Sequence, residues 1–115
     1  MWHRVMLIWI LILKLAILKI SPMDALDMVQ KAYAANFTKV YIRNESGDYY
    51  YRLDDADYYL VYEYTDETTG NYLIHLYEFI VDDTELGTGH IVTYGWYMVN
   101  PYTGEIIPAG TAPTG

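Results

Sequence analysis

Near the C-terminus the chain reads Thr93-Tyr94-Gly95-Trp96-Tyr97-Met98-Val99-Asn100-Pro101-Tyr102-Thr103-Gly104-Glu105-Ile106. This run predicts an aromatic strand, a tight turn and the start of a returning strand, because aromatic residues favour strands while Asn, Pro and Gly favour turns. Trp96 is the only tryptophan outside the first ten residues. We therefore expect Trp96, together with Val99, to build the folded core.

Two further strands are predicted upstream of this hairpin. Residues 58–65 alternate, so one face should carry Tyr58, Leu60, Tyr62 and Tyr64. A polar hairpin loop leads to a strand over 72–81, and an acidic loop over 82–89 leads to the strand over 90–99. Because the connections are short, successive strands should be antiparallel neighbours.

One helix is predicted before the strands. Ser21-Pro22-Met23-Asp24 is typical of a helix start, since Ser caps, Pro fits the first turn and Asp24 completes an imperfect capping box. The helix should span 22–34, with Met23, Leu26, Val29 and Tyr33 at helical spacing. Shorter strands are expected at 38–42, 49–53 and 105–107. The fold class is therefore α+β, with one helix packed on an antiparallel meander sheet of about four to five strands.

Residues 1–20 form an apolar leader with a short basic start at His3 and Arg4. The pattern predicts a leader helix that acts as a signal peptide or uncleaved membrane anchor, with Arg4 keeping the N-terminus inside and the rest exported. A membrane-surface helix and a buried element of the fold are the alternatives. The predicted organisation is a leader over 1–20, one domain over 21–107 and a flexible tail over 108–115.

Composition limits the classes of function. The net charge is −8, and every Asp and Glu lies after residue 20, so the body is strongly acidic. Nucleic acid is excluded as a partner, because its phosphates require a basic surface. The chain has no cysteine, which excludes disulfides, thiol nucleophiles and thiolate metal sites. Its 14 tyrosines fit half-buried strands or an exposed aromatic binding face.

No residue pattern indicates catalysis or a cofactor. His75 and His90 lie on successive predicted strands and could approach each other, but they lack a metal-ligand spacing, so ordinary strand histidines are favoured. The acidic runs 54–57 and 82–85 cluster oxygen ligands without the EF-hand spacing, so solvated turns are favoured over weak calcium sites. Asn36 and Asn44 begin N-glycosylation patterns, for which chance matches are favoured.

Four segments together resemble a known family: Ser21–Leu26 opening a helix, the Tyr-rich strand 58–64, the strand Ile74–Glu78, and the closing run Trp96–Ile106 with its Thr-Gly-Glu-Ile ending. In this order, over residues 21–107, they resemble a PepSY domain. Pro101 in the turn and the insertion over 82–89 depart from the family pattern. The resemblance implies a small non-catalytic, extracytoplasmic domain of bacterial type. Such domains resemble protease propeptides, and they bind and restrain peptidases or act in the cell envelope.

These observations favour an extracytoplasmic protein-binding module, secreted or held at the membrane by residues 1–20, whose partner could be a peptidase. It would use an aromatic sheet face or add a strand at a sheet edge, with Tyr59, Trp96, Tyr97 and Tyr102 as candidate contact residues. The first alternative is a ligand-binding or enzymatic domain on a cystatin-like scaffold, which needs a pocket between helix and sheet. The second is a structural envelope protein with no partner beyond the membrane.

Overall fold

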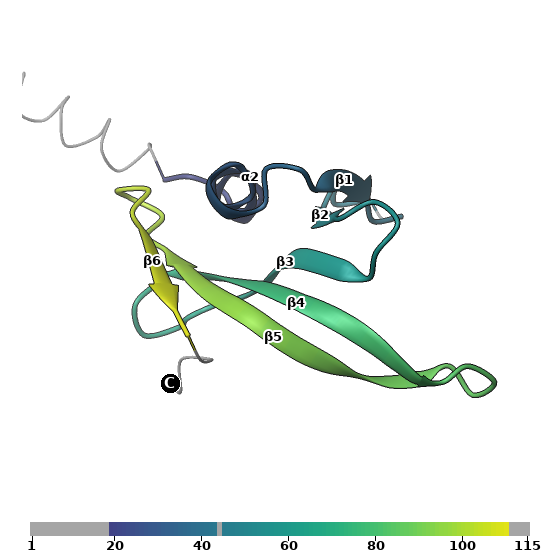
Figure 1. Ribbon diagram of the computed structural model, residues 1–115. Coiled ribbons are helices and arrows are strands. Elements are labelled where there is room, and N and C mark those ends of the chain that lie inside the picture. Colours follow the sequence, from purple (N-terminus) through teal and green to yellow (C-terminus); the bar gives the residue numbers. More distant parts are fainter. Residues whose placement is uncertain (1–18, 44, 111–115) are drawn as a thin grey trace, which may run out of the picture.

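The computed structural model describes residues 19–43 and 45–110 of the 115-residue chain. One helix, α2 (Pro22–Tyr33), packs on a six-stranded antiparallel sheet in which the strands follow one another in chain order (Figure 1). The predicted α+β meander is confirmed, with six strands where about four to five were expected. The strands are β1 (Thr38–Tyr41), β2 (Tyr49–Arg52), β3 (Tyr58–Thr65), β4 (Tyr72–Asp83), β5 (Thr88–Val99) and β6 (Ile106–Ala109).

The short strands expected at 38–42, 49–53 and 105–107 form the two ends of the sheet as β1, β2 and β6. β1 and β2 form a hairpin with each other, in the register that sets Thr38 opposite Arg52 and Tyr41 opposite Tyr49. Each short strand therefore has a pairing partner immediately along the chain, which costs little loop-closure entropy. At the other end, β6 runs two residues past the expected boundary at residue 107, because Pro108 and Ala109 pair with Tyr97 and Trp96.

The predicted helix is confirmed at both ends. The Ser21 hydroxyl accepts a hydrogen bond from the Asp24 backbone N–H at 3.1 Å, and the Asp24 carboxylate accepts one from the Ser21 N–H at 3.3 Å. This capping box satisfies N–H groups that no helical turn reaches. The helix ends at Tyr33, where the Ala34 N–H donates to the Gln30 carbonyl at 2.9 Å.

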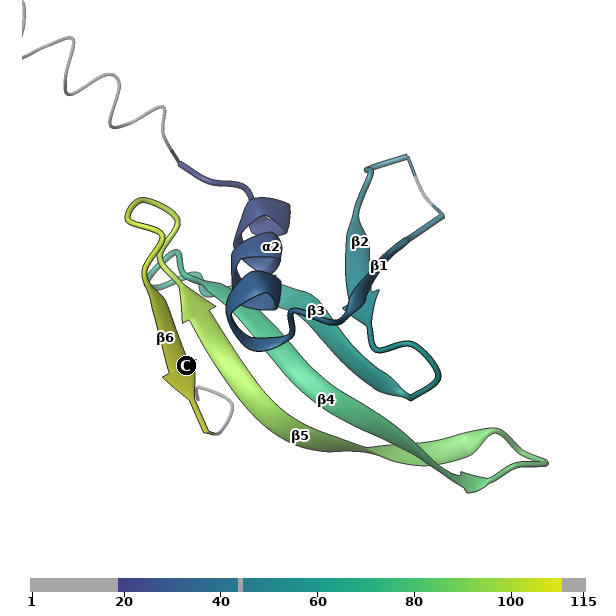
Figure 2. The same ribbon diagram turned by 45° about the horizontal axis from the view of Figure 1, so that its top comes forward.

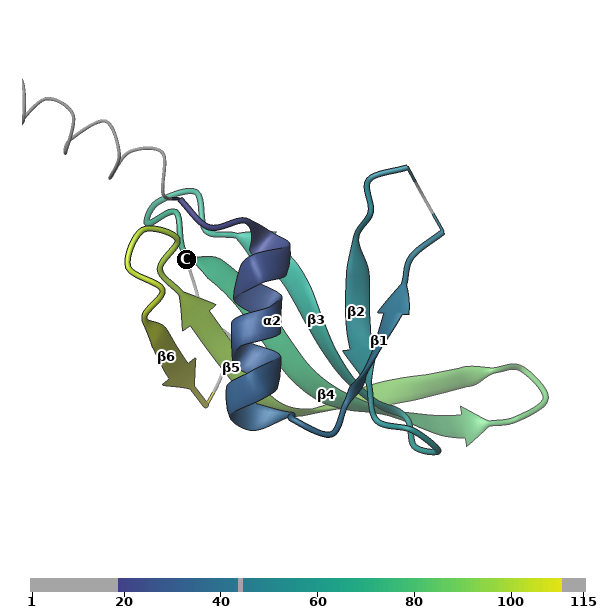
Figure 3. The same cartoon turned by 90° about the horizontal axis from the view of Figure 1, so that it is seen from above.

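The main core lies between α2 and the sheet, which the helix crosses over β3 to β5 (Figure 3). Leu26 and Val29 are fully buried against Leu60, Ile74 and Val99, all at 0% exposure. Burying an aliphatic side chain of this size contributes about 1.5–3 kcal/mol. The remaining buried members of this core are Ala25, Ala34, Tyr51, Tyr72 and Tyr97. Trp96 is not among them, so the expectation that it belongs to this core is wrong.

The turn after β5 is built by Asn100. Its side-chain oxygen accepts hydrogen bonds from the backbone N–H groups of Tyr102 and Thr103 at 2.8 and 3.1 Å. Gly104 has a φ of 74°, a left-handed conformation that glycine adopts without strain. The Pro101 carbonyl accepts from the Ile20 N–H at 2.9 Å, so the turn also fixes the chain just before the helix.

The pairing register shifts at three places, one between β3 and β4 and two between β4 and β5, and the first two alter the expected strand pattern. On β3 the register moves from Tyr62 opposite Ile74 to Tyr64 opposite Leu73, so Glu63 is the extra residue. Tyr64 thereby leaves the face of Leu60 and Tyr62, and the prediction that the four residues share one face is wrong for Tyr64. The second bulge, between β4 and β5, sets Leu76 opposite Gly95 and Tyr77 opposite Thr93. Bulges of this kind bend the strands that carry them.

Half of the acidic loop expected over residues 82–89 is strand. β4 continues to Asp83 and β5 begins at Thr88, which leaves a four-residue connection whose last residue, Gly87, has a φ of 68°. We call residues 77–83 of β4 and 88–94 of β5 the arm. It extends from the helix-covered part of the sheet as a two-stranded ribbon (Figure 2).

Several predictions fall on residues outside the described ones. These are the leader over 1–18, the glycosylation pattern at Asn44 and the last five residues of the tail. Among residues 19–43 and 45–110, no helix has the length and apolar character needed to cross a membrane. Asn36, which begins the other glycosylation pattern, is exposed in the connection between α2 and β1.

Candidate binding surface on the helix-free face of the sheet

The two faces of the sheet are covered differently. Because side chains alternate along a strand, Tyr72, Ile74 and Leu76 of β4 face the helix, while Leu73 and His75 face the other way. We call the second face the helix-free face. Trp96 and Met98 of β5 lie on it, opposite His75 and Leu73 in the register.

Aromatic rings cross the helix-free face from β5 to β2. The Trp96 and His75 rings are stacked, with centroids 4.0 Å apart and planes 5° from parallel. His75 lies 4.8 Å from Tyr77, Tyr77 stacks on Tyr59 at 5.4 Å, and Tyr59 lies 6.0 Å from Tyr50. We call these five residues the ring ladder. Ring pairs at such separations contribute about 0.5–1.5 kcal/mol beyond their burial, so the ladder is a fixed surface.

His75 lies between Trp96 and Tyr77 in the ring ladder. Only 6% of the residue is exposed, its Nδ1 lies 3.0 Å from Glu63 Oε1, and its Nε2 lies 2.8 Å from Thr93 Oγ1. Both ring nitrogens therefore have a partner, as a buried polar group requires. Glu63 lies on this face by strand alternation, two residues after Val61, which is opposite His75. His75 thus orients the ladder, and neither nitrogen is available to a ligand.

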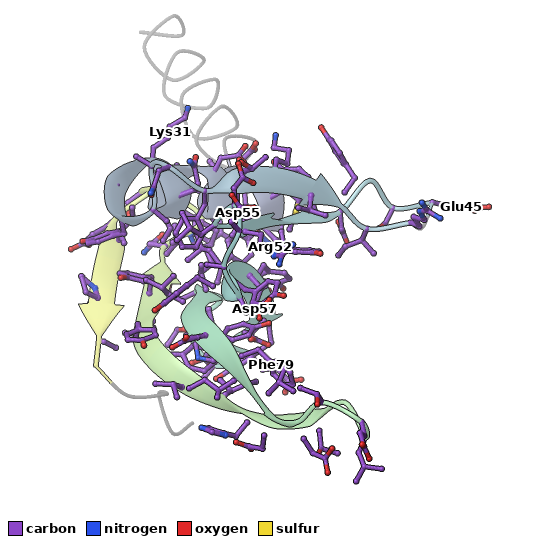
Figure 4. All side chains as sticks on the ribbon, turned by 45° about the vertical axis from the view of Figure 1, so that its right-hand side comes forward. Lys31, Glu45, Arg52, Asp55, Asp57 and Phe79 are labelled. Atoms are coloured by element: carbon purple, nitrogen blue, oxygen red, sulfur yellow. The ribbon has the colours of Figure 1, made fainter. Side chains whose placement is uncertain are left out.

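Charged groups border the far end of the ring ladder. The Arg52 guanidinium lies 5.8 Å from the Tyr59 ring and 3.2 Å from the Asp57 carboxylate (Figure 4). This ion pair is exposed, so it contributes little to stability. Burial raises the pKa of Tyr77 above its ordinary value, and the negative charge of Glu63 adds to the effect.

The four predicted contact residues separate into three places. Tyr59 and Trp96 lie together on the ring ladder, and both are half-buried. Tyr97 lies in the helix-side core, where it is 8% exposed and its ring centroid is 4.5 Å from that of Tyr33. Tyr102 is 63% exposed in the turn after β5, with Lys19 Nζ 5.9 Å from its ring. Two of the four predicted contact residues, Tyr59 and Trp96, therefore lie on the same surface.

Sequence reasoning missed the rest of the ring ladder, namely Tyr50, His75 and Tyr77. One signal was present, because His75 and Tyr77 are two positions apart and must share a face of β4. Their position opposite Trp96 and Thr93 depends on the register, which the bulge after Leu76 shifts by one residue. No pattern in the sequence marks that bulge.

The helix–sheet interface contains one polar cluster. The Asp27 carboxylate accepts hydrogen bonds from Tyr49 Oη at 2.8 Å and from Tyr51 Oη at 2.6 Å. Lys39 Nζ lies 4.1 Å from the centre of the Tyr49 ring. Burial, followed by the hydrogen bond to Asp27, raises the pKa of both tyrosines above the ordinary value. Asp27 therefore links the helix to the first hairpin and is satisfied within the fold.

The predicted metal candidates have other partners. His90 lies opposite Ile80 on the arm, with its Nδ1 2.8 Å from Asp82 Oδ2, and so belongs to the other face from His75. In the acidic turns, Asp54 accepts from Thr38 Oγ1 at 3.2 Å, and Asp83 accepts from two backbone N–H groups at the arm tip. Over the described residues, no group of three or more His, Asp or Glu is placed to hold a metal ion.

Comparisons of this chain with protein-family models, with curated proteins and with solved structures found no match. The chemistry of the helix-free face is therefore the basis for a functional argument. It offers aromatic edges and tyrosine hydroxyls on a rigid sheet, beside exposed apolar residues of the arm.

Proposed function

We propose that this chain is a non-catalytic, extracytoplasmic protein-binding module that contacts its partner through the helix-free face of the sheet. Tyr59 and Trp96 are the contact residues on this surface, and Tyr77 and Tyr50 extend it. His75 is a positioning residue, since it is buried and its ring packs against the rings of Trp96 and Tyr77.

The observation that carries this proposal is the ring ladder itself. Four strands contribute rings to one face, and α2 packs on the opposite face of the sheet. Tyrosine and tryptophan are enriched where proteins meet partners, because they offer a large rigid apolar surface with a polar tip. A face that only kept the sheet soluble would need no such stack of rings.

The proposed cellular location of the protein and the first class of partner to test are inferred from the sequence. The charged-then-apolar leader supports export, with the membrane contacted through residues 1–20. The resemblance to PepSY domains supports a cell-envelope role and a peptidase as the partner. The acidic body supports a partner with a basic surface.

The alternative of a ligand pocket between helix and sheet has no observation in its favour. Leu26, Val29 and Ile74 fill that interface with fully buried side chains. Asp27, the polar group beside it, is already bonded to two tyrosine hydroxyls. A filled interface is the arrangement that counts against a cystatin-like ligand site.

Affinity capture with matched variants tests the proposal. The full chain, Trp96→Ala and Tyr59→Ala would each be immobilised and exposed to the envelope fraction of the source cells. Tyr41→Ala is the control, because Tyr41 is also an exposed strand tyrosine at 66% but lies on β1, away from the ring ladder. We expect both ladder variants to lose a protein that the full chain and the control retain.

Truncating an interface anchor typically costs more than 1 kcal/mol, or roughly fivefold in affinity or more. Far-UV circular dichroism and a thermal melt would confirm that each variant is folded. Identical captured proteins for the full chain and both folded ladder variants would remove the helix-free face from the interface.

A further inference from the structure

The outer edge of β5 is open along the arm. β6 pairs with β5 only from Trp96 to Val99, so over the described residues no strand pairs with this edge between Thr88 and Gly95. On the other side, β3 reaches no farther along β4 than Glu78, followed by one hydrogen bond from the Phe79 N–H to the Asp57 carbonyl at 2.9 Å. An open edge carries backbone donors and acceptors that can pair with another chain.

The strands at the two ends of the described sheet are short and protected, whereas the open stretch of β5 is longer and is not. β1 is a four-residue edge that contains Lys39, and β6 is a four-residue edge that contains Pro108. Short length, lysine and proline are the devices that prevent an edge from pairing. The segment from Thr88 to Gly95 is twice as long and contains neither lysine nor proline.

The arm has one apolar face and one acidic face. Register places Phe79 opposite Ile91 on the helix-free side, and Val81 follows on the same face. Val81 is 43% exposed and Ile91 is 53% exposed. This apolar face continues from the ring ladder, because Tyr77 is the ladder residue next to Phe79.

The opposite face of the arm carries the carboxylates. Glu78 accepts a hydrogen bond from Tyr94 Oη at 2.8 Å, and Asp82 pairs with His90 at 2.8 Å. Asp83 and Glu85 add two more carboxylates near the tip. Between residues 77 and 94 there is no lysine or arginine, so these charges attract a cationic partner.

We propose that the outer edge of β5, from Thr88 to Gly95, binds an extended segment of the partner in which apolar residues alternate with lysine or arginine. An added strand gains affinity from backbone hydrogen bonds and specificity from alternate side chains. Its apolar residues would lie beside Ile91, and its cations would lie on the side of Glu78 and Asp82. This inference rests on the proposed function, since it names the chemistry of the protein partner.

A second copy of this chain fits the edge poorly. Pairing two arms edge to edge would bring the carboxylates of both copies together, and the arm offers no lysine or arginine to offset them. Glu78 and Asp82 lie on β4, one strand in from the edge, so the carboxylates of the two copies would repel one another across the paired β5 strands. The charge pattern therefore favours a basic segment over self-association.

Peptide probes test the inference on the full 115-residue chain, held in a mild non-ionic detergent. The first probe is a capped peptide of Lys-Val repeats, and the second has the same composition arranged as a lysine block followed by a valine block. Calorimetry at low ionic strength should show the alternating peptide binding about tenfold more tightly, because only it separates apolar and cationic side chains onto two faces.

Charge-matched variants locate the site. Asp82→Lys should weaken binding of the alternating peptide by about tenfold, which corresponds to roughly 1.4 kcal/mol. Ile91→Lys, on the apolar face, should weaken it as well. Glu67→Lys is the control, because it makes the same change of charge in the exposed turn between β3 and β4 and should leave the affinity within about twofold.

Equal binding of the two peptides, or equal effects of Asp82→Lys and Glu67→Lys, would reduce the interaction to general electrostatics and overturn the inference. Binding that occurs only after residues 111–115 are removed would mean that the chain's own tail occupies the edge. A concentration-dependent dimer in sedimentation, abolished by Ile91→Lys, would assign the edge to a second copy. Either result would also overturn the inference.

The result is separable from that of the proposed function. If the alternating peptide fails to bind while Trp96→Ala still abolishes capture of a partner, the helix-free face remains a binding surface and only the edge proposal fails. If neither the peptide nor a Trp96-dependent protein binds, both proposals fail.

Discussion

The two halves of the β4–β5 hairpin are made from the same pair of strands but have opposite surroundings. In the proximal half, Tyr72 to His75 are all buried, and Gly95, Tyr97 and Val99 are buried across from them. In the arm, residues 77–83 and 88–94 include none that is buried. The hairpin therefore passes from a fully packed sheet to an uncovered ribbon at the bulge between Leu76 and Tyr77.

The difference lies in what covers the strands, since both halves carry apolar residues. The helix and the neighbouring strands cover the proximal half, while nothing among the described residues covers Phe79, Val81 and Ile91. An isolated two-stranded ribbon is marginally stable in water. The arm is therefore stabilised by the buried proximal half of the hairpin, from which it extends, while its tip is exposed. Retaining apolar side chains on such a ribbon is the property expected of a docking surface.

The largest expected effect comes from equivalent truncations in the two halves. Ile74→Ala removes a fully buried side chain from beneath the helix, and it should lower the free energy of unfolding by about 2–5 kcal/mol. Ile91→Ala removes a side chain that is 53% exposed, and it should change the same quantity by less than about 0.5 kcal/mol. Urea unfolding followed by tryptophan fluorescence would measure both.

This pair is well matched, because both positions are isoleucines on adjacent strands of one hairpin. If Ile91→Ala destabilised the fold as much as Ile74→Ala, the arm would be packed against something in solution. The comparison between a covered half and an uncovered half would then fail.

A smaller effect is expected at the polar link between the helix and the first hairpin. Asp27→Ala leaves the hydroxyls of Tyr49 and Tyr51 without their acceptor, which should cost about 1–3 kcal/mol. The ordinary pKa of these tyrosines is 10.0, and the fold raises both. Because the folded state holds these protons more tightly, the associated stability is fully present below pH 10 and is lost as the pH rises through the raised values.

Ultraviolet absorbance titration is the measurement for this link. Part of the tyrosine ionisation in the native chain should occur above pH 10, and it should move toward the ordinary value in Asp27→Ala. Tyr49→Phe and Tyr51→Phe provide the controls, since each should remove its own share of the delayed ionisation. A native titration with no delayed component would contradict the buried cluster.

Much of the fold was predictable from local sequence. The Ser21–Asp24 capping box, the polar turn at Asn100 to Gly104 and the alternation in Tyr58 to Tyr62 each depend on residues close together in the chain. Local interactions of this kind leave a direct pattern in the sequence. The same reasoning selected Tyr59 and Trp96 as candidate contact residues, and both lie on the ring ladder.

The remaining features of the fold and of the ring ladder depend on strand register and sheet curvature, which cannot be predicted from the local sequence pattern. The bulge at Glu63 moved Tyr64 to the other face, and β4 and β5 each extend two residues beyond the expected strand ends at residues 81 and 90, which lengthens the arm. His75 was interpreted as an ordinary strand histidine, and its place beneath Trp96 follows only from the pairing of β4 with β5. Bulges and long-range pairing depend on tertiary packing, so they override the period-two pattern.

A small effect on global stability is also expected from Gly89→Ala in the arm. A Cβ atom at this position would overlap the Ile80 carbonyl oxygen and lie 2.8 Å from the end of the Phe79 ring, so the backbone of the arm must shift. The helix-side core contains no arm residue, and local openings are energetically separate from global unfolding. The free energy of unfolding should therefore change by less than about 1 kcal/mol, while amide hydrogen exchange accelerates along residues 77–94.

Thr88→Ala, at the neighbouring exposed position, is the control and should leave the exchange of the arm unchanged. Protection of the proximal strands should persist in both variants, because Tyr72 to His75 remain covered. If Gly89→Ala instead lowered protection throughout β4 and β5, the arm and the packed sheet would form one cooperative unit. The hydrogen bonds of the arm would then open only together with those of the whole sheet. In that case a partner strand bound at the β5 edge would slow amide hydrogen exchange in the core as well as in the arm.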